Sequence, residues 1–126
     1  MTRIMLLAGA ALAALALATQ IAAKGPTKLK GDVGPGFTIH LKDAGGKAVK
    51  TLKPGLYSIT VVDKSKIHDF QLEGPGIGKK GKKQITGLKF VGTKTNVLVT
   101  LKKGTFTFVC TPHRKIPTMK GTFKVT

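Results

Sequence analysis

The sequence predicts an all-β fold, in which one antiparallel β-sandwich domain follows an N-terminal export signal. Beyond residue 23, short runs of alternating apolar and polar residues are separated by Gly, Pro and Lys, and no stretch has a convincing helical pattern. Several short strands with regular turn signals within roughly 100 residues are typical of a two-sheet sandwich. No internal repeat or linker divides the chain, so we expect a single domain over residues 24–126.

The N-terminal segment has the layout of a secretory signal peptide. Arg3 provides a positive start, residues 4–18 are an unbroken Ala- and Leu-rich run, and small residues follow. We predict cleavage after Ala23, which makes residues 1–23 the signal peptide, with Ala18 as the alternative site. An uncleaved membrane anchor stays open, because residues 4–23 are uncharged and about as long as a spanning helix requires. Both outcomes place the domain in the periplasm or outside the cell.

The first half of the domain contains three predicted strands. Residues 37–41 alternate apolar side chains with polar ones, and His40 falls on the polar, surface face. A Lys-Pro-Gly turn signal then precedes a run rich in β-formers at 56–62. In the third run, 67–72, the alternation places His68 on the same inward face as two apolar residues.

The second half begins with a Gly- and Lys-rich stretch. We expect residues 77–92 to form a loop with one short strand around 88–90. Three further strands are predicted, at 97–101, 105–110 and 122–125, the first two joined by a Lys-Lys-Gly hairpin turn. In the strand at 105–110, alternation puts two Phe rings and the Cys110 thiol on one face. The thiol therefore lies at the end of a buried aromatic row.

The charge balance is strongly basic. The chain has 22 Lys and Arg against five acids, for a formal net charge of +17, and loss of Arg3 with the leader leaves +16. Nearly all of these cations are Lys, and the chain has one Tyr and no Trp, so specific nucleic-acid recognition is not expected. The positive field favours encounters with an acidic protein. The lysines at 79–83 are the candidates for contact with an anionic membrane or cell surface.

The single cysteine lies within a cluster of metal-ligand residue types. Cys110 is followed by His113 and then by Met119, and His68 lies upstream in a separate strand. An unpaired thiol in an oxidising compartment is a liability, which coordination to a metal removes. Cys, two His and Met are the ligand set of a mononuclear electron-transfer copper site, and they suit both Cu(I) and Cu(II). The sequence therefore predicts one copper ion bound by these four residues.

Each ligand also has another interpretation. Met119 can be a core filler, His68 a buried core histidine, and Cys110 an inert small hydrophobe. Zinc is the weaker metal hypothesis, because closed zinc sites rarely recruit Met. A Cys–His catalytic pair is also conceivable, but the chain has no recognisable oxyanion or orienting arrangement beside it. We therefore expect no enzymatic activity.

The residues around the ligands resemble those of the cupredoxins, with the closest match to small bacterial plastocyanin- and pseudoazurin-like proteins. The shared stretches cover essentially the whole mature chain and are residues 33–37, 67–70, 72–76, 108–113 and 119–123. The resemblance implies a Greek-key β-sandwich with type 1 (blue) copper. It implies that His68, Cys110 and His113 hold the copper in a plane and that Met119 binds axially.

The function implied by the resemblance is a monomeric one-electron carrier in the cell envelope, with acidic redox proteins as partners. Two alternatives stay open. One is an extracytoplasmic protein that stores or passes copper without a redox role, and the other is an interaction module on a sandwich that has lost its metal. The presence of all four ligand types argues against the second alternative.

Two positions depart from the plastocyanin pattern. Five residues separate His113 from Met119, more than plastocyanin-type loops usually carry, which raises the hypothesis that Ile116 and Pro117 hold the thioether away from the metal. Asp69 stands where plastocyanins usually have Asn after the first histidine. An unpaired carboxylate there would place negative charge near the site and favour Cu(II).

Overall fold

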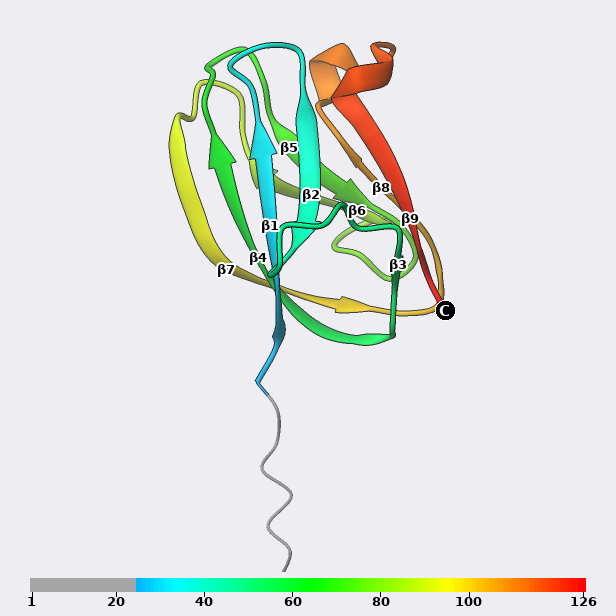
Figure 1. Cartoon of the computed structure of the whole chain (residues 1–126). Helices are drawn as coiled ribbons and strands as arrows, with labels where there is room; N and C mark the ends of the chain where they lie inside the picture. The colour runs from blue at the N-terminus through cyan, green and yellow to red at the C-terminus, as the bar shows by residue number, and fades with distance from the viewer. Residues whose placement is uncertain (1–24) are drawn as a thin grey trace, which may run out of the picture.

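The computed structural model describes residues 25–126, which form two β-sheets packed face to face (Figure 1). The strands are β1 (Thr27–Val33), β2 (Ile39–Asp43), β3 (Thr51–Leu52), β4 (Gly55–Asp63), β5 (Phe70–Glu73), β6 (Lys82–Thr86), β7 (Gly92–Leu101), β8 (Gly104–Val109) and β9 (Lys120–Val125). Two single turns of 3-10 helix, η1 (Thr111–His113) and η2 (Pro117–Met119), lie between β8 and β9. The all-β sandwich is confirmed. The expected leader and its cleavage site lie outside the described residues.

The strand order shows that the chain crosses repeatedly between the sheets. One sheet has the order β2-β1-β4-β7 and the other β3-β9-β8-β5-β6, so neighbours such as β5 and β8 are not consecutive, as in a Greek key. The expectation of a wholly antiparallel sandwich is wrong, because β1 runs parallel to β4 and β3 runs parallel to β9. Alternation along a strand reports which face is buried, but it carries no information on the neighbouring strand.

Strand register determines which loops gather at each end of the sandwich. Val33 at the end of β1 lies opposite Asp63 at the end of β4, and Val109 at the end of β8 lies opposite Lys120 at the start of β9. Figure 1 shows the loop that carries η1 and η2 at the end toward which β1 points. We call this end, with the loops at 34–38, 64–69, 87–91 and 110–119, the ligand end.

Aromatic rings fill the core between the sheets. The rings of Phe106 and Phe123 stack with centroids 5.4 Å apart, and those of Phe70 and Phe108 stack at 6.1 Å. Cys110 continues the buried face of Phe106 and Phe108, as alternation predicts. A Cβ atom at Gly121 would overlap the Phe108 ring, so a glycine is needed where that ring crosses β9. The core therefore extends up to the thiol.

Several predicted strand limits differ from the structure. The short strand expected around 88–90 is wrong, because Lys89 has φ +69° and the Phe90 amide donates to the Gly87 carbonyl at 3.3 Å, which makes this segment a turn. The strand in this region is β6 instead. It lies at the edge of its sheet and buries only Ile85 and Thr86, so its sequence has little of the apolar alternation that identifies a strand.

Two strands had no clear signal in the sequence. β1 has exposed lysines and an internal Gly31, which normally weakens a strand. Here a Cβ at that position would lie 2.8 Å from the ring of Phe70 and 3.0 Å from Val61, so the glycine makes room for the core. β3 has only two residues. Within residues 25–126, no helix has the length and apolar character needed to cross a membrane.

Candidate metal centre

Three of the predicted ligands converge at the ligand end of the sandwich. His68 precedes β5, Cys110 follows β8, and His113 is the last residue of η1. The Nδ1 atoms of His68 and His113 are 3.1 Å apart. Cys110 Sγ lies 3.6 Å from His68 Nδ1 and 3.4 Å from His113 Nδ1. Within the described part of the chain, these residues form the one group of three or more His, Cys or acidic side chains placed to hold a metal.

The dimensions of this triangle fit a single metal ion. A point equidistant from the three atoms lies about 2.0 Å from each of them, the circumradius of a triangle with these sides. Metal bonds to imidazole nitrogen and thiolate sulfur in proteins are about 2.0 and 2.3 Å long. A set of one thiolate and two imidazoles suits copper in both of its common oxidation states. The donor geometry therefore fits one copper ion.

The three donors differ in their access to water. Cys110 and His68 are fully buried, whereas His113 is half-buried. Burial raises the pKa of the Cys110 thiol, an effect only partly opposed by hydrogen bonds from neighbouring groups. Without metal the thiol is therefore neutral near pH 7, and metal binding must release its proton.

The loop between Cys110 and β9 is folded into three consecutive turns. The His113 amide donates to the Cys110 carbonyl at 3.1 Å, the Ile116 amide to the His113 carbonyl at 2.9 Å, and the Met119 amide to the Ile116 carbonyl at 3.0 Å. The Cys110 amide donates to the Met119 carbonyl at 2.9 Å and closes the loop. These turns accommodate the long spacer, and Met119 is fully buried. Axial ligation by its thioether stays a prediction.

Solved structures of known proteins share this arrangement of strands. The copper protein rusticyanin matches with 21% identity over 82% of this chain and 80% of that chain, with a TM-score of 0.54. Rusticyanin from Thiobacillus ferrooxidans matches with 22% identity over 82% and 79%, also with a TM-score of 0.54. A structure of reduced rusticyanin matches with 20% identity over 82% of both chains and a TM-score of 0.55.

The chain has the cupredoxin fold. No protein-family model matches it, and no curated protein sequence is a significant match. The resemblance of the ligand motifs to those of the cupredoxins is thus confirmed at the level of the fold. The plastocyanin- or pseudoazurin-like subtype stays a prediction.

Asp69 has a structural role in this cupredoxin fold that the sequence did not reveal. Its carboxylate accepts hydrogen bonds from the Thr111 amide at 2.6 Å, the Thr111 hydroxyl at 2.5 Å and the Gln84 side chain at 2.8 Å. These donors are neutral and do not cancel the charge of the carboxylate, so its effect on the balance between Cu(II) and Cu(I) stays a prediction. The carboxylate also connects the residue before β5 to the residue that follows Cys110.

Arg114 makes a second connection that the sequence did not reveal. Its guanidinium donates two hydrogen bonds to the Glu73 carboxylate, at 2.6 and 3.1 Å. These bonds lower the pKa of Glu73, mainly through the hydrogen bond itself, and raise the pKa of Arg114. The pair links the residue after His113 to the end of β5. No local motif could have identified it, because the two residues are 41 positions apart.

The structure also places His40 and Phe37, to which the sequence had given positions on a strand. His40 is exposed on the outer face of β2 and contacts Asp32 at 2.8 Å, so its expected surface location is confirmed. Phe37, expected to begin a strand, instead lies in the loop before β2, where its ring contacts both His68 and His113. No motif in the sequence identified Phe37 as a site residue.

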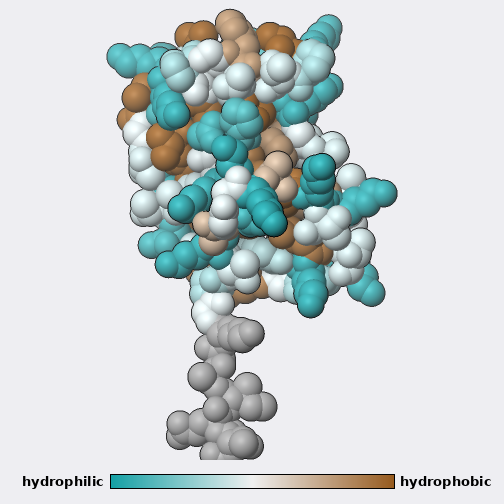
Figure 2. Space-filling view, in the orientation of Figure 1, coloured by the Kyte–Doolittle hydropathy of each residue, from teal (hydrophilic) through white to brown (hydrophobic). Residues whose placement is uncertain are grey.

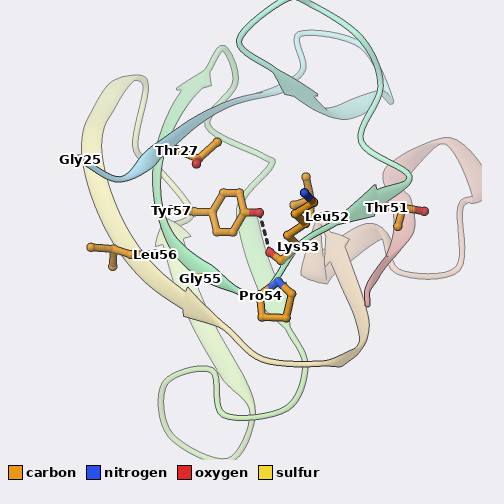
Figure 3. Close-up of a pocket in the computed structure, with 9 residues that line it drawn as sticks. All are labelled: Gly25, Thr27, Thr51, Leu52, Lys53, Pro54, Gly55, Leu56 and Tyr57. Carbon is orange, nitrogen blue, oxygen red and sulfur yellow. Dashed lines mark hydrogen bonds between the residues drawn. The ribbon is translucent and has the colours of Figure 1, made fainter. Parts of the chain in front are cut away.

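A cavity of about 520 Å³ lies at the other end of the cupredoxin fold (Figure 3). It is lined by Gly25, Thr27, Thr51, Leu52, Lys53, Pro54, Gly55, Leu56 and Tyr57. The Tyr57 hydroxyl donates to the Lys53 carbonyl at 2.6 Å. This lining contains no Cys, His or carboxylate side chain. The cavity therefore offers no donor set of the kind found at the ligand end.

Proposed function

We propose that the protein is a type 1 copper protein that carries one electron at a time in the cell envelope, without turning over a substrate. The observation that carries this proposal is the convergence of one thiol sulfur and two imidazole nitrogens within 3.6 Å of one another. Copper bound there supplies the Cu(I)/Cu(II) couple, for which this ligand set is suited. The likeness to rusticyanin supports the fold on which such a site is built.

The protein's part in electron transfer is to hold the donors still. His68 lies two residues before β5 and Cys110 directly follows β8, and the Met119 carbonyl holds the Cys110 amide. Asp69 and Glu73 attach the ligand loop to β5. Donors held from several directions keep their positions when the charge of the bound ion changes. A small rearrangement means a small barrier to gain or loss of an electron.

The same donor set favours copper over zinc. Closed structural zinc sites have four strong ligands, usually Cys and His. In the part of the chain that the structure describes, the group of such donors contains three residues, and the remaining predicted ligand is a thioether. Thioether sulfur is a soft donor that is typical of copper sites.

We place the docking of an acidic redox partner at the ligand end. Ile67, Leu88 and Val91 are each more than half exposed there, and the Lys89 amide donates to the Lys66 carbonyl at 3.0 Å, which joins their two loops. Figure 2 shows hydrophobic residues gathered at this end, next to hydrophilic ones. An apolar surface with lysines beside it suits a partner that has an apolar contact area surrounded by carboxylates.

The lysines at 79–83 belong to another part of this proposal. They lie in the connection from β5 to β6 and at the start of β6. The side chain of Lys102, in the β7–β8 connection, lies close to the same segment, 3.4 Å from the position that a Cβ of Gly76 would take. We propose this group for contact with an anionic membrane or cell surface, which leaves the ligand end facing its partners. The N-terminal export signal would deliver the domain to that compartment.

Titration of the metal-free protein with Cu(II) tests the proposal. We expect an intense visible thiolate-to-copper band that saturates at one equivalent. The variants Cys110→Ser and His68→Ala should lose this band, and His40→Ala is the matched control because its imidazole lies outside the site. A wild-type protein without the band, or a band that depends on His40, would contradict the proposal.

A second measurement separates an electron carrier from a copper-handling protein. A carrier exchanges electrons rapidly between its oxidised and reduced forms and keeps its copper through many cycles. A handling protein releases Cu(I) readily to a chelator. We expect rapid electron self-exchange, measured by NMR line broadening in mixtures of the two forms, together with slow transfer of Cu(I) to bicinchoninate. Slow self-exchange with rapid release would favour the handling role.

A further inference from the structure

The side chain of Phe37 lies against both histidines of the metal centre. Its ring centroid is 5.4 Å from that of His68 and 5.0 Å from that of His113, with edge-to-face angles of 73° and 83°. The two imidazoles are 4.8 Å apart and cross at 75°. Edge-to-face contacts between rings are favourable and directional. The phenyl ring therefore helps to set the tilt of both imidazoles.

The segment that carries this ring is attached to the metal centre at two points. The Gly34 amide donates to the Thr38 carbonyl at 3.0 Å, which closes residues 34–38 into a turn that we call the strap. A Cβ at Gly34, where φ is +75°, would lie 3.0 Å from the His68 ring, so the strap passes directly against this imidazole. The Thr118 hydroxyl donates to the Phe37 carbonyl at 2.5 Å and attaches the strap to the ligand loop.

The burial of these residues shows what the strap covers. Phe37 is 49% exposed, whereas His68, whose ring it contacts, is 0% exposed, and so is Cys110, whose sulfur lies 3.6 Å from His68 Nδ1. Phe37 therefore lies between bulk water and the first imidazole. A Phe ring that is half exposed gains little from burial in a core. The Phe37 ring instead contacts the His68 and His113 imidazoles, where it can shield them from water.

We propose that Phe37 is the gate of the metal centre, a positioning residue that also limits access. It orients the imidazoles of His68 and His113, and it closes the path by which chelators and small ligands reach the buried donors. Exchange of the metal then requires displacement of the strap. This inference rests on the proposed copper site and adds the control of metal exchange, the property that distinguishes a carrier from a copper-handling protein.

The copper-loaded protein provides the first test. Loss of both edge-to-face contacts in Phe37→Ala should accelerate transfer of Cu(I) to bicinchoninate about tenfold. Thr118→Val, which removes only the hydroxyl that holds the strap, should produce a smaller acceleration. Leu98→Ala is the matched control, because Leu98 is 54% exposed on β7 and has no place in the strap or in the proposed docking surface. Its transfer rate should equal that of the wild type.

A metal-free measurement tests the gate independently of copper. Iodoacetamide alkylates the Cys110 thiol of the metal-free protein, and we expect about tenfold faster alkylation in Phe37→Ala, with Phe37→Leu between the two because it retains an apolar cover. Far-UV circular dichroism establishes that each variant is folded. Equal alkylation rates in the wild type and Phe37→Ala would overturn the gate. If the wild type forms no blue copper band, the proposed function fails. The alkylation rates still show whether Phe37 limits access to Cys110.

Discussion

Thr111 donates two hydrogen bonds to the Asp69 carboxylate, one from its amide at 2.6 Å and one from its hydroxyl at 2.5 Å. Asp69 directly follows His68, and Thr111 directly follows Cys110. The contact therefore joins the residues next to two donors that are 42 positions apart in sequence. One carboxylate therefore holds the spacing between the segment after β8 that carries the thiol and the segment before β5 that carries the first imidazole.

Replacement of Asp69 should destabilise the metal-free protein. Asp69→Ala leaves the Thr111 amide and hydroxyl without their acceptor, and an unsatisfied buried polar group costs about 1–3 kcal/mol. Asp69→Asn retains one carbonyl acceptor and should lose less. Urea unfolding measures both, with Asp32→Ala on the exposed face of β1 as the control. Equal stability of Asp69→Ala and the wild type would show that the contact does not hold the loop.

The stability of the metal-free protein should decrease at alkaline pH because of Cys110. Burial raises the pKa of this thiol above its ordinary value of 9.0. The folded state therefore favours the neutral thiol. The contribution of the thiol to stability is complete below pH 9, and it is lost as the pH rises through the higher pKa of the folded state.

The difference between the wild type and Cys110→Ala isolates this contribution, because other groups that titrate in the same range, including Tyr57, are present in both proteins. Chemical unfolding between neutral and strongly alkaline pH should show the wild type losing stability relative to the variant. A constant difference across this range would mean that the thiol is no harder to ionise in the folded protein than in the unfolded chain.

The pair of Arg114 and Glu73 should stabilise the fold at neutral pH and not in acid. The guanidinium lowers the pKa of Glu73 below its ordinary value of 4.5, so the contribution is present above that pH and disappears as the pH falls through the folded value. Because Arg114 is 45% exposed, Arg114→Gln should cost at most about 1 kcal/mol at pH 7. Lys115→Gln is the control, and a cost for Arg114→Gln that persists at pH 2 would contradict the assignment.

Met119→Leu tests the axial ligand. Leu has a similar volume and should cost less than about 1.5 kcal/mol in stability, although the side chain is fully buried. If the thioether binds copper, its loss removes electron donation that favours Cu(II), and the reduction potential should rise. Cyclic voltammetry and the visible spectrum measure this change. An unchanged spectrum and potential would show that the thioether does not reach the metal.

The three side chains that converge at the ligand end were predictable because residue type and spacing are local properties of the sequence. Cys110 and His113 lie three residues apart beside a predicted strand end. His68 is buried as predicted, but the strand expected at 67–72 begins only at Phe70, so His68 lies in the loop before it. The side chains that support the donors were not predictable in the same way. Phe37 was assigned to a strand, Asp69 was expected to act through its charge, and Arg114 was treated only as part of the loop.

The difference between these two groups is one of distance along the chain. Residue type and periodicity are properties of short segments, and they were sufficient for the all-β class, the turn signals and the identity of three donors that meet. The contacts of Asp69 with Thr111, Glu73 with Arg114 and Phe37 with Thr118 span 42, 41 and 81 residues. Such contacts depend on strand order and register, including the parallel pairing of β1 with β4. Packing of the two sheets establishes that order, because it brings segments together according to the surfaces they bury and not their separation in sequence.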